Sequence, residues 1–231
     1  MIRCTARTYS LSGGLGLVLD LDGVMVDSNR VHSACWREYL RRCGIAMPEG
    51  FDQRMFGRHN SEIVRLVFGP GLAAAEVFRH GAEKEKLYRE RMGPVLGEHL
   101  VPGVAAFLER HREAPMAVAT NAEPANVAFI LERGGLRGFF RVVIDGAQVS
   151  KPKPAPEVYL RAAAGLGILP ADCIVFEDSI AGAKAARDAG ARVVAVETTH
   201  PASALAPVEL SIRDFLDAAL EEWLSRQRPV H

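Results

Sequence analysis

The feature that most constrains this chain is a short apolar run that ends in two acids. Residues 16–19 are Gly-Leu-Val-Leu, and Asp20-Leu21-Asp22-Gly23 follows directly. An uninterrupted apolar run of this length is typical of a parallel strand that is buried on both faces. In an open α/β sheet, ligands bind outside the carboxyl ends of the strands. Two neighbouring carboxylates repel each other unless a cation meets them, so the motif indicates a divalent metal site at this edge.

The rest of the chain predicts strands alternating with helices. Further strands are expected at residues 116–119, 141–144, 173–176, 192–196 and 208–212. Apolar residues at helical spacing predict helices between them, including one over residues 156–164 that Gly165 ends and a closing helix over residues 215–224. Alternation at this short spacing predicts an α/β fold with a doubly wound, Rossmann-like parallel sheet.

One block of the chain interrupts the alternation. From Ile45 to about Leu100 no β-rich run occurs, and helices are expected from Ser28 to Gly44, around residues 63–68 and over residues 73–91. We therefore predict a helical cap domain at residues 29–98. Residues 1–28 and 99–231 then form the core domain, with residues 1–14 as a loose extension.

The composition argues against several classes of partner. The 28 Lys and Arg residues balance the 28 Asp and Glu residues, which leaves no electrostatic footprint for nucleic acid or an anionic membrane. No apolar run reaches membrane-spanning length, and the first 14 residues lack the apolar core of a secretory signal. The four cysteines are scattered without a Cys-x-x-Cys pair, so we expect reduced structural thiols and a cytoplasmic protein. A monomer is expected.

Chemistry-bearing residues follow several of the predicted strands. Glu177 and Asp178 end a second apolar strand, and Thr120-Asn121 ends a third. Because the carboxyl ends of parallel strands share one edge, these side chains can converge with Asp20 and Asp22. A proline-rich loop, Ser150-Lys-Pro-Lys-Pro-Ala-Pro-Glu157, adds lysines. Acids, a hydroxyl, an amide and a lysine on one rim suit Mg²⁺ together with a phosphate group. A Walker-type loop is missing from the sequence, which argues against a P-loop NTPase.

These motifs, in this order, resemble those of the haloacid-dehalogenase superfamily of phosphoryl-transfer enzymes, in its branch with a helical cap after the first strand. The resemblance extends from Gly16 to about Val196. It implies that Asp20 is the nucleophile that attacks phosphorus and that Asp22 is the general acid/base. It implies that Thr120 binds the transferring phosphoryl group. The metal ligands it implies are Asp20, Asp22, Glu177 and Asp178, with the backbone carbonyl as a further candidate at Asp22.

Two lysines compete for the third motif of this superfamily. Lys153 is preferred over Lys151 because its distance in sequence from Glu177-Asp178 agrees with relatives. The other lysine is then a solvated loop charge. Thr120 and the Glu177-Asp178 pair also have plainer interpretations, a hydroxyl that satisfies the loop backbone and acids that stabilise a helix N-terminus.

Within the superfamily, the chain is most similar to the branch of β-phosphoglucomutase and its phosphatase relatives. The spacing of His32 from Asp20 resembles a histidine that assists cap closure and the acid/base step, although a structural histidine is the default on such a helix. Lys84 resembles a cap lysine that meets substrate. Arg58 and Asn121 are further candidate substrate contacts.

The sequence favours hydrolysis over isomerisation. The cap segment around Arg58 lacks the mutase spacing, and Glu123 stands where a cation would receive a second phosphate. We therefore predict a Mg²⁺-dependent phosphatase that hydrolyses a small phosphorylated metabolite, a sugar phosphate, through an aspartyl-phosphate. The alternatives are a phosphosugar mutase and a non-catalytic binding module on the same fold.

Overall fold

A single parallel sheet forms the core of the protein, as predicted. The computed structural model describes residues 14–55 and 58–230. Six strands pair in the order β3-β2-β1-β4-β5-β6, and every pair is parallel. The strands are β1 (Gly16–Leu19), β2 (Met116–Ala119), β3 (Val142–Ile144), β4 (Cys173–Glu177), β5 (Arg192–Val196) and β6 (Leu210–Ile212).

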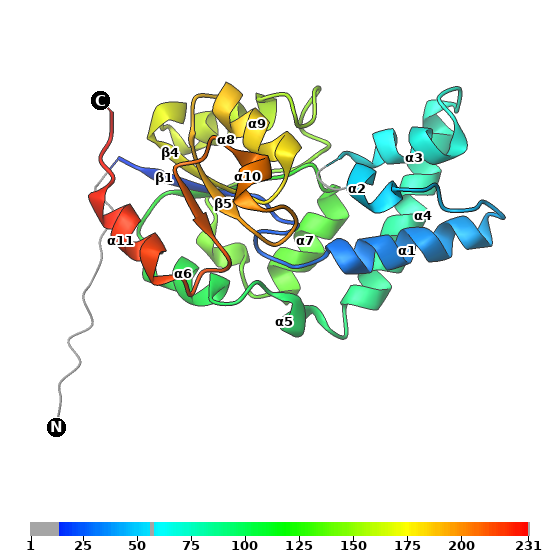
Figure 1. Cartoon of the computed structure of the whole chain (residues 1–231), viewed down its shortest axis with the longest axis horizontal. Coiled ribbons are helices and arrows are strands. Elements are labelled where there is room, and N and C mark those ends of the chain that lie inside the picture. The colour runs from blue at the N-terminus through cyan, green and yellow to red at the C-terminus, as the bar shows by residue number, and fades with distance from the viewer. Residues whose placement is uncertain (1–13, 56–57, 231) are drawn as a thin grey trace.

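Helices cover both faces of this sheet (Figure 1). Successive residues of β1 point to opposite faces, so Leu17 and Leu19 join one apolar cluster while Val18 joins the other. The first cluster is closed by α6 (Val104–Arg110), α7 (Pro124–Arg133) and α11 (Ala218–Arg226). The second is closed by α8 (Glu157–Leu166), α9 (Ile180–Asp188) and α10 (Ala202–Leu205). This is the doubly wound arrangement that the strand and helix alternation predicts.

The cap helices project from one end of the sheet (Figure 1). They are α1 (Asn29–Arg42), α2 (Phe51–Met55), α3 (Asn60–Phe68) and α4 (Ala74–Met92). Trp36, Phe51 and Val64 belong to an apolar cluster of their own, apart from the two sheet clusters. The second half of α4 differs, because Tyr88 and Met92 pack in the cluster of the sheet. The predicted boundary at residues 98 and 99 falls inside the short helix α5 (Leu96–His99), and the domain division stays a proposal.

Some predicted boundaries were wrong. Gly165 lies inside α8, which continues to Leu166 and is followed by Gly167 in the left-handed conformation with φ of 69°. The closing helix begins at Ala218, so Phe215 and Leu216 precede it. Two short 3₁₀ turns, Arg137–Phe139 and Pro170–Asp172, were not predicted. Their three residues carry too little periodicity to reveal a helix.

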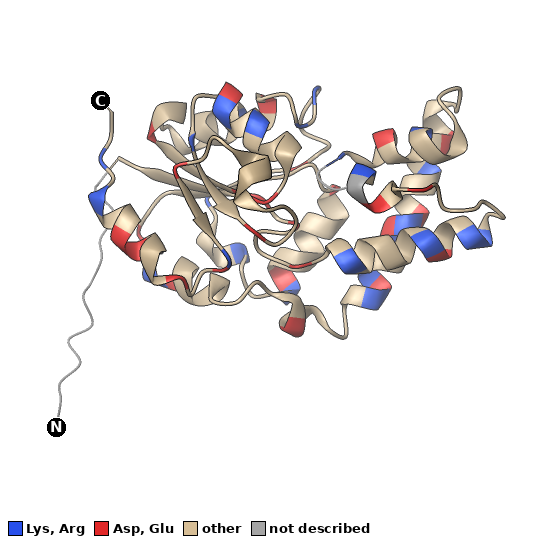
Figure 2. Ribbon diagram, viewed as in Figure 1, with Lys and Arg blue, Asp and Glu red and all other residues tan. Residues whose placement is uncertain are grey.

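Charges of both signs are interspersed along the cap helices (Figure 2). In the part of the chain that the structure describes, no helix is both long and apolar enough to cross a membrane. Cys35 and Cys173 are buried free thiols and Cys43 is an exposed one. The predicted loose extension and Cys4 lie outside the described residues, except for Gly14.

Candidate active site

The carboxylate of Asp20 lies beside a buried lysine at the end of β1. Lys153 Nζ is 2.9 Å from Asp20 Oδ1 and 2.7 Å from Glu177 Oε1. The contact with Asp20 lacks hydrogen-bond geometry, so Asp20 Oδ1 is a buried acceptor without a hydrogen-bond donor among the described residues. Burial raises the pKa of Asp20 to about 7, because lost solvation and the nearby Glu177 outweigh the attraction of Lys153. Burial opposes the charged lysine too, but Asp20 and Glu177 outweigh it and raise the pKa of Lys153.

Glu177, the last residue of β4, is a fully buried hydrogen-bond hub. Its Oε1 accepts hydrogen bonds from Lys153 Nζ and, at 2.6 Å, from the hydroxyl of Tyr159. Its Oε2 accepts from the backbone N–H of Asp178 and from the backbone and hydroxyl of Ser179. Burial opposes ionisation of Glu177, yet Lys153 and these donors lower its pKa. A Cβ at Gly182 would lie 1.7 Å from Glu177 Oε1, so only glycine lets the carboxylate rest over the start of α9.

Asp178 faces the first acidic motif across the sheet edge. A Cβ at Gly23 would lie 1.8 Å from Asp178 Oδ2, and Gly23 has φ of 80°, so the Asp-x-Asp-Gly turn requires glycine twice over. The hydroxyl of Thr199, just after β5, donates to Asp178 Oδ2. Burial and the charges of Glu177 and Asp20 raise the pKa of Asp178 well above its usual range.

Three of the four predicted ligand side chains can share one cation. Ligand oxygens of Asp20, Glu177 and Asp178 all lie within 4.8 Å of one another. Hard carboxylate oxygens suit Mg²⁺, and Asp20 Oδ1, which has no hydrogen-bond donor among the described residues, supplies an acceptor for it. The group does not include Asp22, whose Oδ1 contacts Ser28 and His32. Asp22 as a metal ligand, through its side chain or its backbone carbonyl, stays a prediction.

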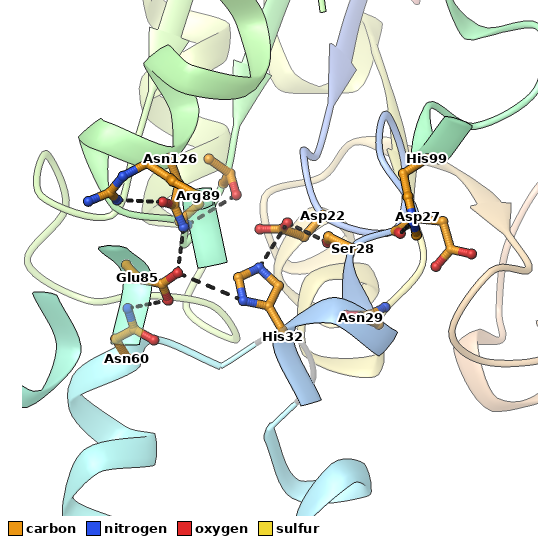
Figure 3. Close-up of polar contacts among 12 residues, drawn as sticks. Asp22, Asp27, Ser28, Asn29, His32, Asn60, Glu85, Arg89, His99 and Asn126 are labelled. Carbon is orange, nitrogen blue, oxygen red and sulfur yellow. Dashed lines mark hydrogen bonds and ion pairs between the residues drawn. The ribbon is translucent and has the colours of Figure 1, made fainter. Parts of the chain in front are cut away.

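Asp22 is held by the first cap helix and the turn before it (Figure 3). Ser28 Oγ donates to Asp22 Oδ1 at 2.5 Å, and His32 Nε2 lies 3.4 Å from the same oxygen. Ser28 therefore binds Asp22 instead of capping α1, for which its side chain makes no hydrogen bond. Burial opposes ionisation of Asp22, but these contacts outweigh burial and lower its pKa.

His32 connects Asp22 to the cap. Its Nδ1 lies 2.9 Å from Lys84 Nζ, and because an ammonium group only donates, Nδ1 must accept. The ring proton of His32 then sits on Nε2, facing Asp22. The ring stacks on Tyr88 with centroids 3.8 Å apart.

The residues predicted after β2 and in the proline-rich loop lie at the same edge. Thr120 lines the cavity above Asp20, and its Oγ1 accepts the backbone N–H of Ala122. Asn121 grips the loop backbone, since its Oδ1 accepts from Lys153 N at 3.0 Å. The Lys151 side chain is exposed, and the backbone N–H of this residue donates to Glu157. Of the two competing lysines, Lys153 is the one that reaches the acids.

The cap residues differ in how they meet this cavity of about 70 Å³. Lys84, predicted as a substrate contact, is buried and paired with Glu85 at 2.5 Å, with its ammonium 4.9 Å from the Trp36 ring centre. Arg58 also lines the cavity but is half exposed and lies 3.7 Å from Glu62. The sequence analysis did not name Glu85, Asn126, Tyr159 and Thr199 as site partners, and it placed Ser28 at the start of the first cap helix. Only Glu85 had a signal, as the neighbour of Lys84.

The fold and the site together define a class of enzyme, one with a doubly wound sheet whose acidic edge is covered by helices. Comparisons with known proteins give the family. A family model described as haloacid dehalogenase-like hydrolase matches residues 16–190. The chain belongs to the haloacid dehalogenase-like hydrolase family.

Its relatives include a sugar-phosphate phosphatase and a phosphosugar mutase, the two kinds of enzyme that the sequence resemblance indicates. The chain is 33% identical over 181 residues to the fructose-1-phosphate phosphatase YqaB of Escherichia coli, covering 78% of this chain and 95% of that protein. It is 29% identical over 220 residues to a β-phosphoglucomutase of Bacillus subtilis, covering 90% of this chain and 94% of that one. A β-phosphoglucomutase structure from Clostridium difficile has the same fold, with a TM-score of 0.79, 23% identity and coverage of 91% and 96%. The chain is thus an enzyme of a family with phosphatases and mutases.

We expect Mg²⁺ to raise the melting temperature, and to do so more at pH 8 than at pH 6. Without metal, the raised pKa of Asp20, about 7, means that the folded protein holds more protons than the unfolded chain between about pH 4 and 7. Stability of the metal-free protein therefore falls as pH rises through this window. Mg²⁺ needs ionised ligands, so its affinity rises over the same window. Thermal melting with and without Mg²⁺ measures the shift.

Two carboxylate variants on neighbouring segments control this measurement. Asp178→Asn should abolish most of the shift, whereas Asp188→Asn, at an exposed position on α9, should keep it. A shift that is equal at both pH values, or that survives in Asp178→Asn, contradicts the assignment of the site.

Proposed function

We propose that the protein is a Mg²⁺-dependent phosphomonoesterase that hydrolyses a small sugar phosphate through an aspartyl-phosphate on Asp20. The observation that carries the proposal is the Asp20 carboxylate, buried at the base of the cavity with Lys153 Nζ at 2.9 Å. A carboxylate is a weak nucleophile, and a dianionic phosphate can approach it only where cationic groups offset the repulsion. The family's phosphatases, including the fructose-1-phosphate phosphatase, support this chemistry.

The residues of the site have distinct roles in the proposed reaction. Asp20 attacks phosphorus, the ester P–O bond breaks, and Asp22 gives a proton to the leaving oxygen. Asp22 then takes a proton from the water that hydrolyses the aspartyl-phosphate. Thr120 and Lys153 stabilise the phosphoryl oxygens. The lowered pKa of Asp22 favours its base form in the free protein, and a bound phosphate dianion opposes ionisation and favours its acid form.

Asp20, Glu177 and Asp178 would hold the Mg²⁺ ion, with the backbone carbonyl of Asp22 as a further candidate. The ion would neutralise charge on the phosphate as the P–O bond breaks. The cap, proposed as residues 29–98, would exclude bulk water and select the substrate. Arg58, Lys84 and Asn121 stay proposed substrate contacts. The monomeric state and cytoplasmic location stay predictions.

Hydrolysis is favoured over the mutase reaction by the environment of Glu123. Glu123 pairs with Arg89 of α4, so this arginine is already engaged at the place where a second phosphate would be received. The mutase remains the second candidate, because the Bacillus subtilis β-phosphoglucomutase aligns with 90% of this chain.

A screen of sugar phosphates with and without Mg²⁺ tests the proposal. We expect inorganic phosphate to be released only with Mg²⁺ and at least about tenfold faster than any isomer forms. Glucose 1-phosphate and glucose 6-phosphate are assayed for both products, with a glucose bisphosphate as primer. Isomer without phosphate release would establish the mutase, and no turnover in the whole panel would favour the binding module.

A further inference from the structure

Glu85 is a buried acid of the cavity that the proposed reaction does not use. It lies on α4, is 3% exposed and lines the same cavity as Asp20 and Thr120. Burial opposes its ionisation, but the adjacent Lys84 ammonium and the hydrogen bonds from Lys84 and Asn126 outweigh burial and lower its pKa to about 2. Glu85 thus presents a permanent negative charge to whatever occupies the cap side of the cavity.

The Glu85 carboxylate is held by one asparagine from a cap helix and one from a core helix (Figure 3). Its Oε1 accepts from Asn60 Nδ2 of α3 at 2.7 Å, and its Oε2 accepts from Asn126 Nδ2 of α7 at 2.7 Å. The Asn126 amide is held in turn, because its Oδ1 accepts from Arg89 Nη1 at 2.7 Å. Glu85 and Arg89 are one helical turn apart on α4, so Glu85 accepts from the Nδ2 of Asn126 while Arg89 donates to its Oδ1. The direction of the carboxylate is therefore set by three elements.

The cations near Glu85 are already engaged. Lys84 is buried against Glu85 and His32, and Arg89 is paired with Glu123. Arg58 is half exposed near Glu62. Among the described residues that line the cavity, its cap side offers no buried cation free of an acidic partner. A second phosphate or a carboxylate of the substrate would meet the Glu85 carboxylate and would find the nearest cation, Lys84, already paired with it.

Hydroxyl groups fit this surface better. Glu85 Oε2 has only one hydrogen-bond donor, Asn126, with His32 Nδ1 at 3.8 Å. A carboxylate oxygen can accept two hydrogen bonds, so Oε2 can take one more from a substrate hydroxyl. Such charge-assisted bonds are about twice as strong as neutral ones.

We propose that Glu85 is a specificity-determining residue, which restricts the enzyme to monophosphates whose organic portion is an uncharged polyol. Its carboxylate accepts a hydrogen bond from a hydroxyl group and repels a second anionic group. The inference rests on the proposed phosphatase function and names the substrate class of that site.

The test compares one sugar with one and with two phosphates. The probes are fructose 1-phosphate and fructose 1,6-bisphosphate in the first instance, or else the sugar monophosphate hydrolysed fastest in the screen and its bisphosphate. The measured quantity is the ratio of kcat/KM for the monophosphate to that for the bisphosphate. Glu85→Gln keeps the shape and removes the charge, so we expect this ratio to fall at least about tenfold. Glu90→Gln, an exposed acid on the same helix, should leave it unchanged.

A second variant moves the ratio in the opposite direction. Lys84→Gln removes the cation that offsets Glu85, so the ratio should rise by a few fold at least. A general loss of packing cannot produce opposite shifts in two neighbouring variants, and thermal melting checks that each one folds. A ratio within threefold of wild type in Glu85→Gln, or a fall in Lys84→Gln, overturns the inference. No phosphate release by the wild-type protein would instead refute the proposed function.

Discussion

Asp20→Asn should lower phosphate release by about 10⁴-fold or more while the protein stays folded. The amide has nearly the size of the carboxylate, so packing at the end of β1 is kept. It cannot form the aspartyl-phosphate, and it removes one of the oxygens that would hold the cation. Because burial already disfavours the charged form of Asp20, its neutral replacement should cost little stability. Steady-state assays with Mg²⁺, together with thermal melting, measure both effects.

Asp145→Asn is the matched control for this experiment. Asp145 directly follows β3, so it lies at the same edge of the sheet, but its carboxylate accepts a backbone hydrogen bond from Ala147. We expect its activity to stay within about threefold of wild type. Activity above about 1% in Asp20→Asn would exclude Asp20 as the nucleophile.

Lys153→Met should lower both the free energy of unfolding and the activity. The substitution leaves Asp20 and Glu177 buried without their cation, and removal of one partner of a buried ion pair typically costs about 3–5 kcal/mol. The loss should shrink as pH falls, because protonation removes the unpaired charge. The phosphoryl oxygens also lose a cation, which should lower kcat/KM by about 10²–10³-fold. Chemical denaturation at several pH values in metal-free buffer, and kinetics with Mg²⁺, give the two quantities.

Lys151→Met makes the same chemical change two residues away, at an exposed position. Its unfolding free energy should stay within about 0.5 kcal/mol of wild type, and its kcat/KM within about threefold. Equal effects from the two variants, or a fully stable Lys153→Met, would contradict the ion-pair assignment.

The sheet and its acidic edge could be predicted because each depends on short stretches of sequence. An apolar run followed by Asp20, and a second one followed by Glu177, are local signals, and parallel pairing then brings their ends together. The order and spacing of the motifs predicted Thr120 and Lys153 as site residues. The resemblance to a known superfamily decided between Lys151 and Lys153. The prediction that Gly165 ends the helix was wrong, because one glycine is tolerated inside a helix whose other residues pack well.

The cap side of the site could not be predicted in the same way. Cap charges such as Lys84 are ordinarily solvated, but Glu85, His32 and Trp36 enclose this one. Asn60 and Asn126 meet Glu85 only after three helices from different parts of the chain have packed. No periodicity in the sequence encodes that meeting, since it depends on how the cap rests on the core.

The hydrogen bonds around Glu177 have a further consequence for the resting enzyme. Among the described residues, the donors to this side chain come from the strand end, the following turn, α8 and the proline-rich loop. These donors lie in separate segments, so folding of the chain orients the acid. A divalent ion that binds beside Glu177 would therefore meet a carboxylate whose direction the fold already sets.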